Sequence, residues 1–238
     1  MIPLRDTNPI RRLPIVTLAL IGLSVAAFGV ELAVAGGPDG EAALDQLFRQ
    51  WGAVPSRITA ALHGSGDPIP AAAGVLGSLF LHAGWTHLLG NMLFLWIFGN
   101  NIEDRLGRLP FLAFYLAAGA IAALAQVWID PTSGVPLVGA SGAIAATLGA
   151  YIVLYPRARI TTLVFLGIFV QLVRVPALII LGLWFALQLL NGVASLGGAA
   201  AQGGVAFFAH IGGFVAGALV GVIVRSLGRP QPVGHGRA

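Results

Sequence analysis

The stretch LVGASGAIAATLGA, residues 137–150, places a hydroxyl group at the start of an apolar run. Ser141 lies between Gly139 and Gly142, and the rest of the run contains nothing reactive. The two glycines permit a tight turn from a loop into a helix and a close approach of a neighbouring helix. The stretch therefore predicts an apolar helix that begins at Ser141.

The composition of the whole chain places such helices in a lipid bilayer. Of its 238 residues, 57% are hydrophobic and only 9% are charged, and the mean hydropathy is +0.88. Soluble domains have roughly a quarter of their residues charged. The chain contains no cysteine, which excludes disulfides, iron–sulfur clusters and thiolate chemistry. We expect an all-α polytopic membrane protein, a single domain over residues 1–238.

Six apolar segments are close to the roughly 20 residues that a helix needs to cross a bilayer. They are Leu13–Val34, Thr86–Ile102, Leu109–Trp128, Ser141–Tyr155, Ala177–Val193 and Val205–Val224. The first could be mistaken for a signal peptide, but its uncharged part is longer than a signal core, so we expect a retained helix. The segment Ile160–Val173 is shorter and is bounded by arginines, which predicts an interfacial or re-entrant position.

The arginines predict the orientation of these spans, since cytoplasmic loops are enriched in basic residues. All 13 basic residues are arginine, and six spans with a cytoplasmic N-terminus leave only Arg49 and Arg57 outside. A seventh span at Ile160–Val173 would reduce the bias from eleven against two to seven against six. The six-span arrangement predicts cytoplasmic tails at residues 1–12 and 225–238 and an external loop at 36–73.

Two further expectations follow from the distribution of charge and apolar residues. Within the external loop, residues 42–51 have an apolar helical face, which predicts a short helix lying in the membrane interface. The arginines are scattered and form no basic run, so no nucleic acid partner is expected. The use of arginine alone and the lack of a transit-like segment favour a bacterial plasma membrane, with membrane lipid as the surroundings.

Few groups able to do chemistry fall within the apolar segments, where such groups are costly. His87 and Asn91 are four residues apart and share a helical face, and His82 precedes them. Ser141 begins the fourth segment, and His210 lies about five residues into the sixth. In the six-span arrangement the second, fourth and sixth helices all begin at the outer face. All five residues are therefore expected in the same leaflet.

These residue types suit acyl transfer. A serine hydroxyl becomes nucleophilic when a base takes its proton, and a neutral imidazole is the base suited to pH 7. Ser141 and His210 can form such a dyad. The side chains of His87 and Asn91 and the backbone N–H of Ser141 could stabilise the oxyanion that develops. Each residue also has a purely structural interpretation, as a helix cap or as an interhelical hydrogen-bonding group.

Three motifs on three segments together resemble the rhomboid intramembrane serine proteases. They are HAGWTHLLGN at 82–91, GASG at 139–142 and AHIGGFVAG at 209–217, and the resemblance extends from about Trp51 to Val224. It implies a six-helix rhomboid-like bundle. It also implies an endopeptidase that cuts transmembrane segments of single-pass membrane proteins near the outer membrane face, with no metal, ATP or other cofactor.

The resemblance assigns a role to each candidate residue. Ser141 corresponds to the nucleophile and His210 to the general base, while His87 and Asn91 correspond to oxyanion stabilisation. His82 is assigned a supporting role, together with Gly139 and Gly142 around the nucleophile. One position departs from the family pattern. Some members carry a tyrosine four residues after the serine, stacked on the histidine, and this chain has Ala145 there, which leaves open what orients His210.

Other classes of function match the sequence less well. A catalytically inactive rhomboid-like protein that binds membrane clients is the main alternative, although it should lack the serine or the histidine. A transporter would need intramembrane charges or repeated halves, and a zinc protease would carry an H-E-x-x-H motif. The GSGD at 64–67 is similar to the motif of intramembrane aspartyl proteases but lies in a polar loop. The sequence does not indicate whether the protein is a monomer or an oligomer.

Overall fold

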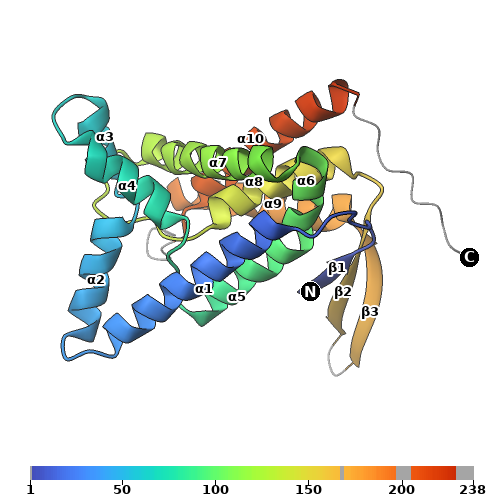
Figure 1. Cartoon of the computed structure of the whole chain (residues 1–238), viewed down its shortest axis with the longest axis horizontal. Coiled ribbons are helices and arrows are strands. Elements are labelled where there is room, and N and C mark those ends of the chain that lie inside the picture. The colour runs from blue at the N-terminus through green and yellow to red at the C-terminus, as the bar shows by residue number, and fades with distance from the viewer. Residues whose placement is uncertain (1, 167–168, 197–204, 229–238) are drawn as a thin grey trace, which may run out of the picture.

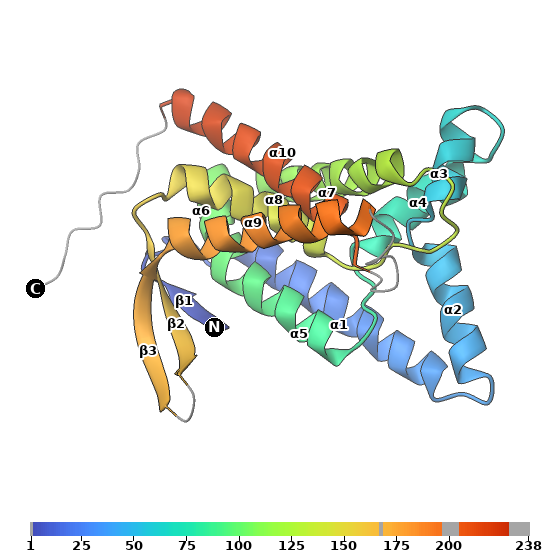
Figure 2. The ribbon, with the colours of Figure 1, turned by 180° about the vertical axis from the view of Figure 1, so that it is seen from behind.

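The helix α8 (Ser141–Leu154), which begins at the serine of the opening motif, lies at the centre of the fold. The computed structural model describes residues 2–166, 169–196 and 205–228. Nearly every residue of α8 is buried. Figure 1 and Figure 2 show the other long helices around it, with α7 and α10 on one side and α9 on another. The residue that begins this helix therefore lies within the bundle.

Four of the described helices are long and apolar enough to cross a membrane, by length and composition. They are α1 (Ile15–Ala35), α7 (Arg108–Ile129), α9 (Ala177–Leu196) and α10 (Phe207–Ser226). The apolar helix α8 is shorter. The second predicted segment is helical but contains a π-helical turn, since α5 (Trp85–Phe94) continues through η1 (Leu95–Gly99) into α6 (Asn100–Leu106). All six predicted segments are thus helical, and four of them reach membrane-spanning length as single regular helices.

The region expected to be an external loop, residues 36–73, is largely helical. It contains α2 (Gly40–Trp51), α3 (Pro55–Leu62) and the first part of α4 (Pro68–Ser78). The helix predicted at residues 42–51 is confirmed as α2. Proline at the first position of α3 and of α4 suits a helix start, and the Asp67 side chain accepts a hydrogen bond from the backbone of Ile69. Local start signals therefore explain helices that hydropathy alone does not show.

A three-stranded antiparallel sheet corrects the expected fold class. It consists of β1 (Ile2–Asp6), β2 (Arg159–Leu166) and β3 (Phe169–Pro176), in that order. Most of the segment Ile160–Val173 therefore lies in the paired strands β2 and β3, and the N-terminal tail contributes a strand. The apolar length of this segment predicts an interfacial or re-entrant position, whereas its many β-branched residues favour strands. The fold is mostly helical, not all-α as predicted.

The two ends of the bundle differ. Figure 1 shows α2, α3 and α4 gathered at one end and the sheet at the other. The loop before α8 belongs to the first end, because Ala53 and Leu137 form a β-bridge and the backbone N–H of Gly139 donates to the carbonyl of Ser78, at 2.8 Å. Ser141 therefore begins α8 at the end that carries α2 to α4.

Close packing of α10 on α8 depends on the glycines at positions 213, 217 and 221 of α10. A Cβ atom added at Gly217 would overlap the carbonyl oxygen of Ala146, and one at Gly213 would overlap that of Gly142. The two backbones are therefore in direct contact along this face. Because Gly213 lies three residues after His210, this contact brings the histidine close to the start of α8.

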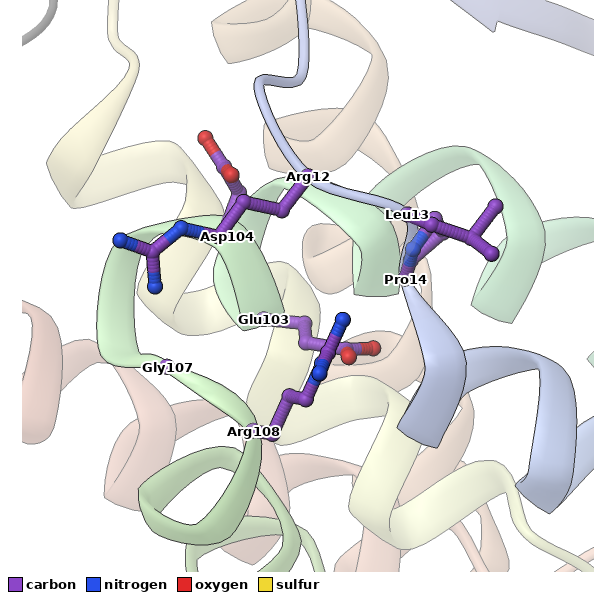
Figure 3. Close-up of a pocket in the computed structure, with 7 residues that line it drawn as sticks. All are labelled: Arg12, Leu13, Pro14, Glu103, Asp104, Gly107 and Arg108. Atoms are coloured by element: carbon purple, nitrogen blue, oxygen red, sulfur yellow. The ribbon is translucent and has the colours of Figure 1, made fainter.

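At the sheet end, the side chain of Glu103 holds the start of α1. Its carboxylate accepts hydrogen bonds from the backbone N–H of Val16 and of Thr17 and from the Thr17 hydroxyl, at 2.8 to 3.0 Å. Figure 3 shows Glu103 in a pocket between the start of α1 and the start of α7, with Arg108 beside it, while Arg12 and Asp104 line the same pocket. The first N–H groups of a helix have no partner within the helix, so this carboxylate replaces a capping residue. The sequence reading did not identify Glu103.

Candidate active site

A cavity of about 630 Å³ lies beside the start of α8. It is lined by residues of α5, α8 and α9, by the loop before α8 and by the first residues around α10. Four of the predicted site residues line it: His87, Asn91, Ser141 and His210. Residues from three separate motifs of the sequence thus face one space.

Ser141 and His210 are in hydrogen-bond contact. The Nε2 atom of His210 lies 2.7 Å from Oγ of Ser141. Ser141 is the first residue of α8, and His210 lies in the first turn of α10. The glycine contacts between the two helices place both side chains at the same depth in the bundle. The arrangement brings a hydroxyl and an imidazole together in the geometry that proton transfer requires.

The other ring nitrogen of His210 contacts a residue that the sequence reading missed. Nδ1 of His210 lies 2.8 Å from Oε1 of Gln188 on α9. The ring of Trp184, one helical turn earlier, lies 5.8 Å from the His210 ring, measured between centroids. Gln188 could have been noticed as one of the few polar residues in the apolar sequence of α9. Its contact with His210, however, depends on how α9 is rotated against α10, which the sequence does not reveal.

Ala145 has only a methyl group as its side chain, which cannot stack on the histidine ring. It is fully buried, and its Cβ faces Gly213 at the contact between α8 and α10. The contacts that surround the His210 ring come instead from α9, through Trp184 and Gln188.

His87 and Asn91 lie against the turn that leads into Ser141. Gly139 has φ of +125°, and a Cβ atom there would lie 2.7 Å from Nε2 of His87 and 3.7 Å from Nδ2 of Asn91. A side chain at Gly139 would thus be strained and would also clash. Glycine leaves both nitrogen atoms free to approach this turn.

Both nitrogen atoms are available as hydrogen-bond donors. The backbone N–H of Ala83 donates to Nδ1 of His87 at 3.3 Å, so Nε2 carries the hydrogen in the neutral ring. Nδ2 of Asn91 is buried and has no hydrogen-bond partner within the described part of the chain. A buried donor without a partner is costly and indicates a site that something else occupies. The pair suits an oxygen atom that becomes negatively charged beside Ser141.

His82 is fully buried behind this pair and does not line the cavity. Its ring meets that of His87 edge-on, with 5.2 Å between centroids, and Nδ1 donates to the carbonyl oxygen of Phe80 at 3.0 Å. Its backbone N–H donates to the Glu31 carboxylate in α1. Burial opposes the charged form and lowers the pKa of His82 to about 4, so the ring is neutral near pH 7. The contacts suit a residue that holds His87 in place.

Gly142, the last of the predicted site residues, serves helix packing. A Cβ atom there would lie 2.6 Å from Cβ of Ala122 on α7 and 3.7 Å from the carbonyl oxygen of Ala209 on α10. Only glycine allows both helices to approach the start of α8 this closely.

Comparison with known proteins identifies the family of the chain. A family model described as a Rhomboid domain matches residues 72–227, more than half of the chain. "Rhomboid protein 1, mitochondrial" of Saccharomyces cerevisiae is 29% identical over 207 residues, which cover 85% of this chain and 51% of that protein. "Rhomboid protease GluP" of Bacillus subtilis is 34% identical over 150 residues, covering 62% of this chain and 26% of that protein.

A third relative, "Presenilin-associated rhomboid-like protein, mitochondrial" of Homo sapiens, is 36% identical over 97 residues, covering 40% of this chain and 25% of that protein. The chain thus spans about half the length of the yeast relative and a smaller share of the other two. The family match covers α5 to α10, and every helical residue that lines the cavity belongs to one of these helices. With four membrane-length helices among the described residues, the chain is an integral multi-pass membrane protein that belongs to the rhomboid family.

Proposed function

We propose that this protein is an intramembrane serine endopeptidase in which Ser141 is the nucleophile and His210 the general base. The observation that carries the proposal is the 2.7 Å contact between Oγ of Ser141 and Nε2 of His210 at the edge of a cavity. Proteins of the rhomboid family are generally intramembrane serine proteases, which agrees with this proposal.

The first half of the reaction forms an acyl-enzyme. Oγ of Ser141 attacks the carbonyl carbon of the scissile bond while Nε2 of His210 takes the hydroxyl proton. The carbonyl oxygen becomes an oxyanion, which accepts hydrogen bonds from Nε2–H of His87, Nδ2–H of Asn91 and the backbone N–H of Ser141. This backbone N–H is at a helix start, where it has no partner within the helix. The imidazolium then gives its proton to the leaving amide nitrogen, and the C–N bond breaks.

The second half restores the enzyme. His210 takes a proton from a water molecule, which attacks the ester carbonyl carbon, and the ester bond breaks as Oγ of Ser141 regains a proton from the imidazolium. The same three donors stabilise the second oxyanion. No metal or organic cofactor takes part in the proposed steps.

The proposed substrate is a transmembrane segment of a single-pass membrane protein. Peptide bonds of a helix are shielded by the helix's own hydrogen bonds, so a segment must become extended before Ser141 can attack it. The cavity beside Ser141 has mostly apolar lining residues, such as Ile144 and Leu148, together with the polar groups described above. Such a surface suits an extended apolar chain.

The proposed topology has six membrane spans and a cytoplasmic N-terminus, with the site near the outer face. The α5–η1–α6 run and α8 are then spans as well, in addition to the four membrane-length helices. The location of Arg157 and Arg225 at the sheet end supports this orientation, because basic residues favour the cytoplasmic side. We propose a bacterial plasma membrane, although the names of two relatives place those proteins in mitochondria.

A cleavage assay in liposomes tests the function. The protein is reconstituted with fluorescent single-pass model substrates, and the wild type is compared with Ser141→Ala, His210→Ala and, as a matched control, Ser226→Ala at the exposed end of α10. We expect cleavage by the wild type and by Ser226→Ala, with no change on addition of a chelator, and none by the other two variants.

Two results would contradict the proposal. Equal cleavage by all four proteins would remove Ser141 and His210 from the reaction. Substrate capture by the wild type and by Ser141→Ala alike, with no cleavage of any substrate, would support a rhomboid-like protein that binds membrane clients without cutting them.

A further inference from the structure

We propose that Gln188 is a positioning residue that completes a Ser141–His210–Gln188 triad. Its side-chain oxygen accepts a hydrogen bond from Nδ1–H of His210 and keeps the imidazole in the form that can accept the serine proton. The inference rests on the proposed protease function and answers what orients His210 when residue 145 is alanine.

The tautomer of His210 depends on what its Nδ1 atom contacts. A neutral imidazole carries one hydrogen, on either Nδ1 or Nε2. Oε1 of Gln188, 2.8 Å from Nδ1, is a hydrogen-bond acceptor, so the hydrogen is on Nδ1 and the lone pair is on Nε2. Nε2 then faces Oγ of Ser141 as an acceptor, at 2.7 Å. The opposite tautomer would direct an N–H toward the serine and could not take its proton.

The position of Gln188 is fixed by contacts of α9 with α10 on both sides of it. Before it, the rings of Phe185 and Phe214 are stacked, with centroids 4.3 Å apart and an interplanar angle of 18°. After it, Gly192 allows close approach, since a Cβ atom there would lie 3.2 Å from Cδ1 of Ile211. The amide therefore reaches His210 from a helix that is attached at two points.

Trp184 contacts the His210 ring from the same face of α9 as Gln188. It precedes Gln188 by four residues and so lies on the same face of α9. Its ring centroid is 5.8 Å from that of His210, with an interplanar angle of 41°. One turn of α9 thus supplies both an aromatic contact and a hydrogen bond to the imidazole.

The contact with His210 explains why the apolar helix α9 contains the polar residue Gln188. Most of α9 is apolar and exposed, as expected of a helix that faces lipid. An amide without a partner in such surroundings is unfavourable, whereas one that is hydrogen-bonded between helices is tolerated. Gln188 is half-buried with its oxygen on His210, so the contact accounts for its presence.

The chemistry of the proposed triad differs from that of Ser-His-Asp. In that triad a carboxylate both orients the histidine and stabilises the imidazolium, whereas a neutral amide only orients it, as in the Cys-His-Asn proteases. Replacing Gln188 by glutamate should therefore preserve the acceptor and add a negative charge beside Nδ1. The charge would favour the protonated ring, which gives a measurable signature.

The test uses the full-length protein in liposomes. The variants are Gln188→Leu, Gln188→Glu and, as a matched control, Gln171→Leu on the exposed strand β3. Two quantities are measured from pH 5 to 9: kcat and KM for a transmembrane model substrate, and the rate at which a fluorophosphonate labels Ser141. Thermal unfolding in detergent is measured for each protein.

The expected results separate positioning from folding. Gln188→Leu should lower kcat and the labelling rate by about 10- to 100-fold with KM little changed. Gln188→Glu should recover most of the activity and move the acid-side midpoint of the pH profile upward by about one pH unit. Gln171→Leu should stay within about twofold of the wild type. A purely structural role would not move the pH profile.

Several results would overturn the inference. Wild-type kcat in Gln188→Leu would do so, as would a Gln188→Glu variant that folds like the wild type but is as inactive as Gln188→Leu. If Gln188→Leu does not fold, the pH profile of Gln188→Glu is the test of the inference. An acid-side midpoint that does not shift in this variant would then contradict the role of Gln188. Failure of Ser141 to react in the wild type would instead refute the proposed function, which keeps the two failures distinguishable.

Discussion

The Oε1 atom of Glu31, in the second half of α1, accepts a hydrogen bond of 3.0 Å from the backbone N–H of His82. This contact joins the first membrane-length helix to the loop that leads into α5. Both side chains are buried. The contact fixes the backbone next to His82, whose ring lies against the ring of His87. The position of one proposed oxyanion donor therefore depends on a residue about fifty positions earlier in the chain.

The buried His82 predicts a loss of stability in acid. Its pKa is lowered to about 4 by burial, whereas the unfolded chain titrates near 6.5. Between these values the unfolded state binds more protons, so the stabilisation is complete above pH 6.5 and is lost as the pH falls through 4. We expect His82→Asn, which can still donate to the Phe80 carbonyl, to reduce the fall in Tm between pH 7 and pH 4 by about 5 °C.

The matched control for this measurement is His63→Asn, at an exposed position after α3. It should leave Tm at pH 7 close to that of the wild type, because an exposed side chain contributes little to stability. The same dependence in His82→Asn as in the wild type would show that His82 is not the group that titrates.

Asn91 predicts a loss of activity without a loss of stability. Its Nδ2 atom has no partner within the described residues, so truncation breaks no hydrogen bond of this nitrogen in the resting protein. Asn91→Ala should lower kcat by about 10²- to 10³-fold, the usual effect of removing one oxyanion donor, while KM and Tm change little. Asn191→Ala, at an exposed position on α9, is the control. Unchanged kcat in Asn91→Ala would exclude a role in oxyanion stabilisation.

The contact of Gly217 with α8 predicts that the geometry of the active site depends on helix packing away from the cavity. A Cβ atom at this position would overlap the carbonyl oxygen of Ala146, and a backbone atom cannot move aside as a flexible side chain can. Gly217→Ala should therefore destabilise the protein by about 1–3 kcal/mol and lower kcat, because α10 must move away from α8. The measurements are Tm in detergent and cleavage in liposomes.

Gly182 provides the comparison for Gly217. It lies in α9 with nothing near the position of an added Cβ atom. Gly182→Ala should leave kcat unchanged and raise Tm slightly, since alanine favours a helix by roughly 1 kcal/mol over glycine. Equal effects of the two substitutions would refute the role assigned to the contact between α8 and α10.

The absence of cysteine from the sequence allows a direct test of the six-span topology. Single-cysteine variants H63C, R157C and S226C place one thiol each at exposed positions of the structure. In intact cells a membrane-impermeant maleimide should label only H63C, and the other two should react after permeabilisation. Labelling of S226C together with H63C in intact cells would contradict the odd number of spans that the six-span topology places between these positions.

The sequence was sufficient to predict the convergence of His87, Asn91, Ser141 and His210. The reason is that each lies near the start of an apolar helix, and the order of spans determines which starts share a side of the membrane. The hydropathy and arginine patterns carry that information. The apolar helical face of residues 42–51 was sufficient to predict α2, whereas the start of α3 depends on a local proline signal.

Two features could not be predicted by that reasoning. The paired strands β2 and β3 have the hydropathy of a short apolar segment, and the pairing of β2 with Ile2–Asp6 is a long-range contact that no local pattern encodes. The contact of Gln188 with His210 depends on the rotation of one helix against another. Ala145 showed that an orienting group was missing from the expected place, but only the structure identifies the residue that contacts His210.

Intact mass spectrometry of the fluorophosphonate-treated protein tests the central claim most directly. If Ser141 is a nucleophile activated by His210, the wild type gains the mass of one adduct, Ser141→Ala gains none, and His210→Ala reacts at least about 100-fold more slowly. An adduct that forms equally on Ser141→Ala, or a reaction of His210→Ala at the wild-type rate, would contradict the claim.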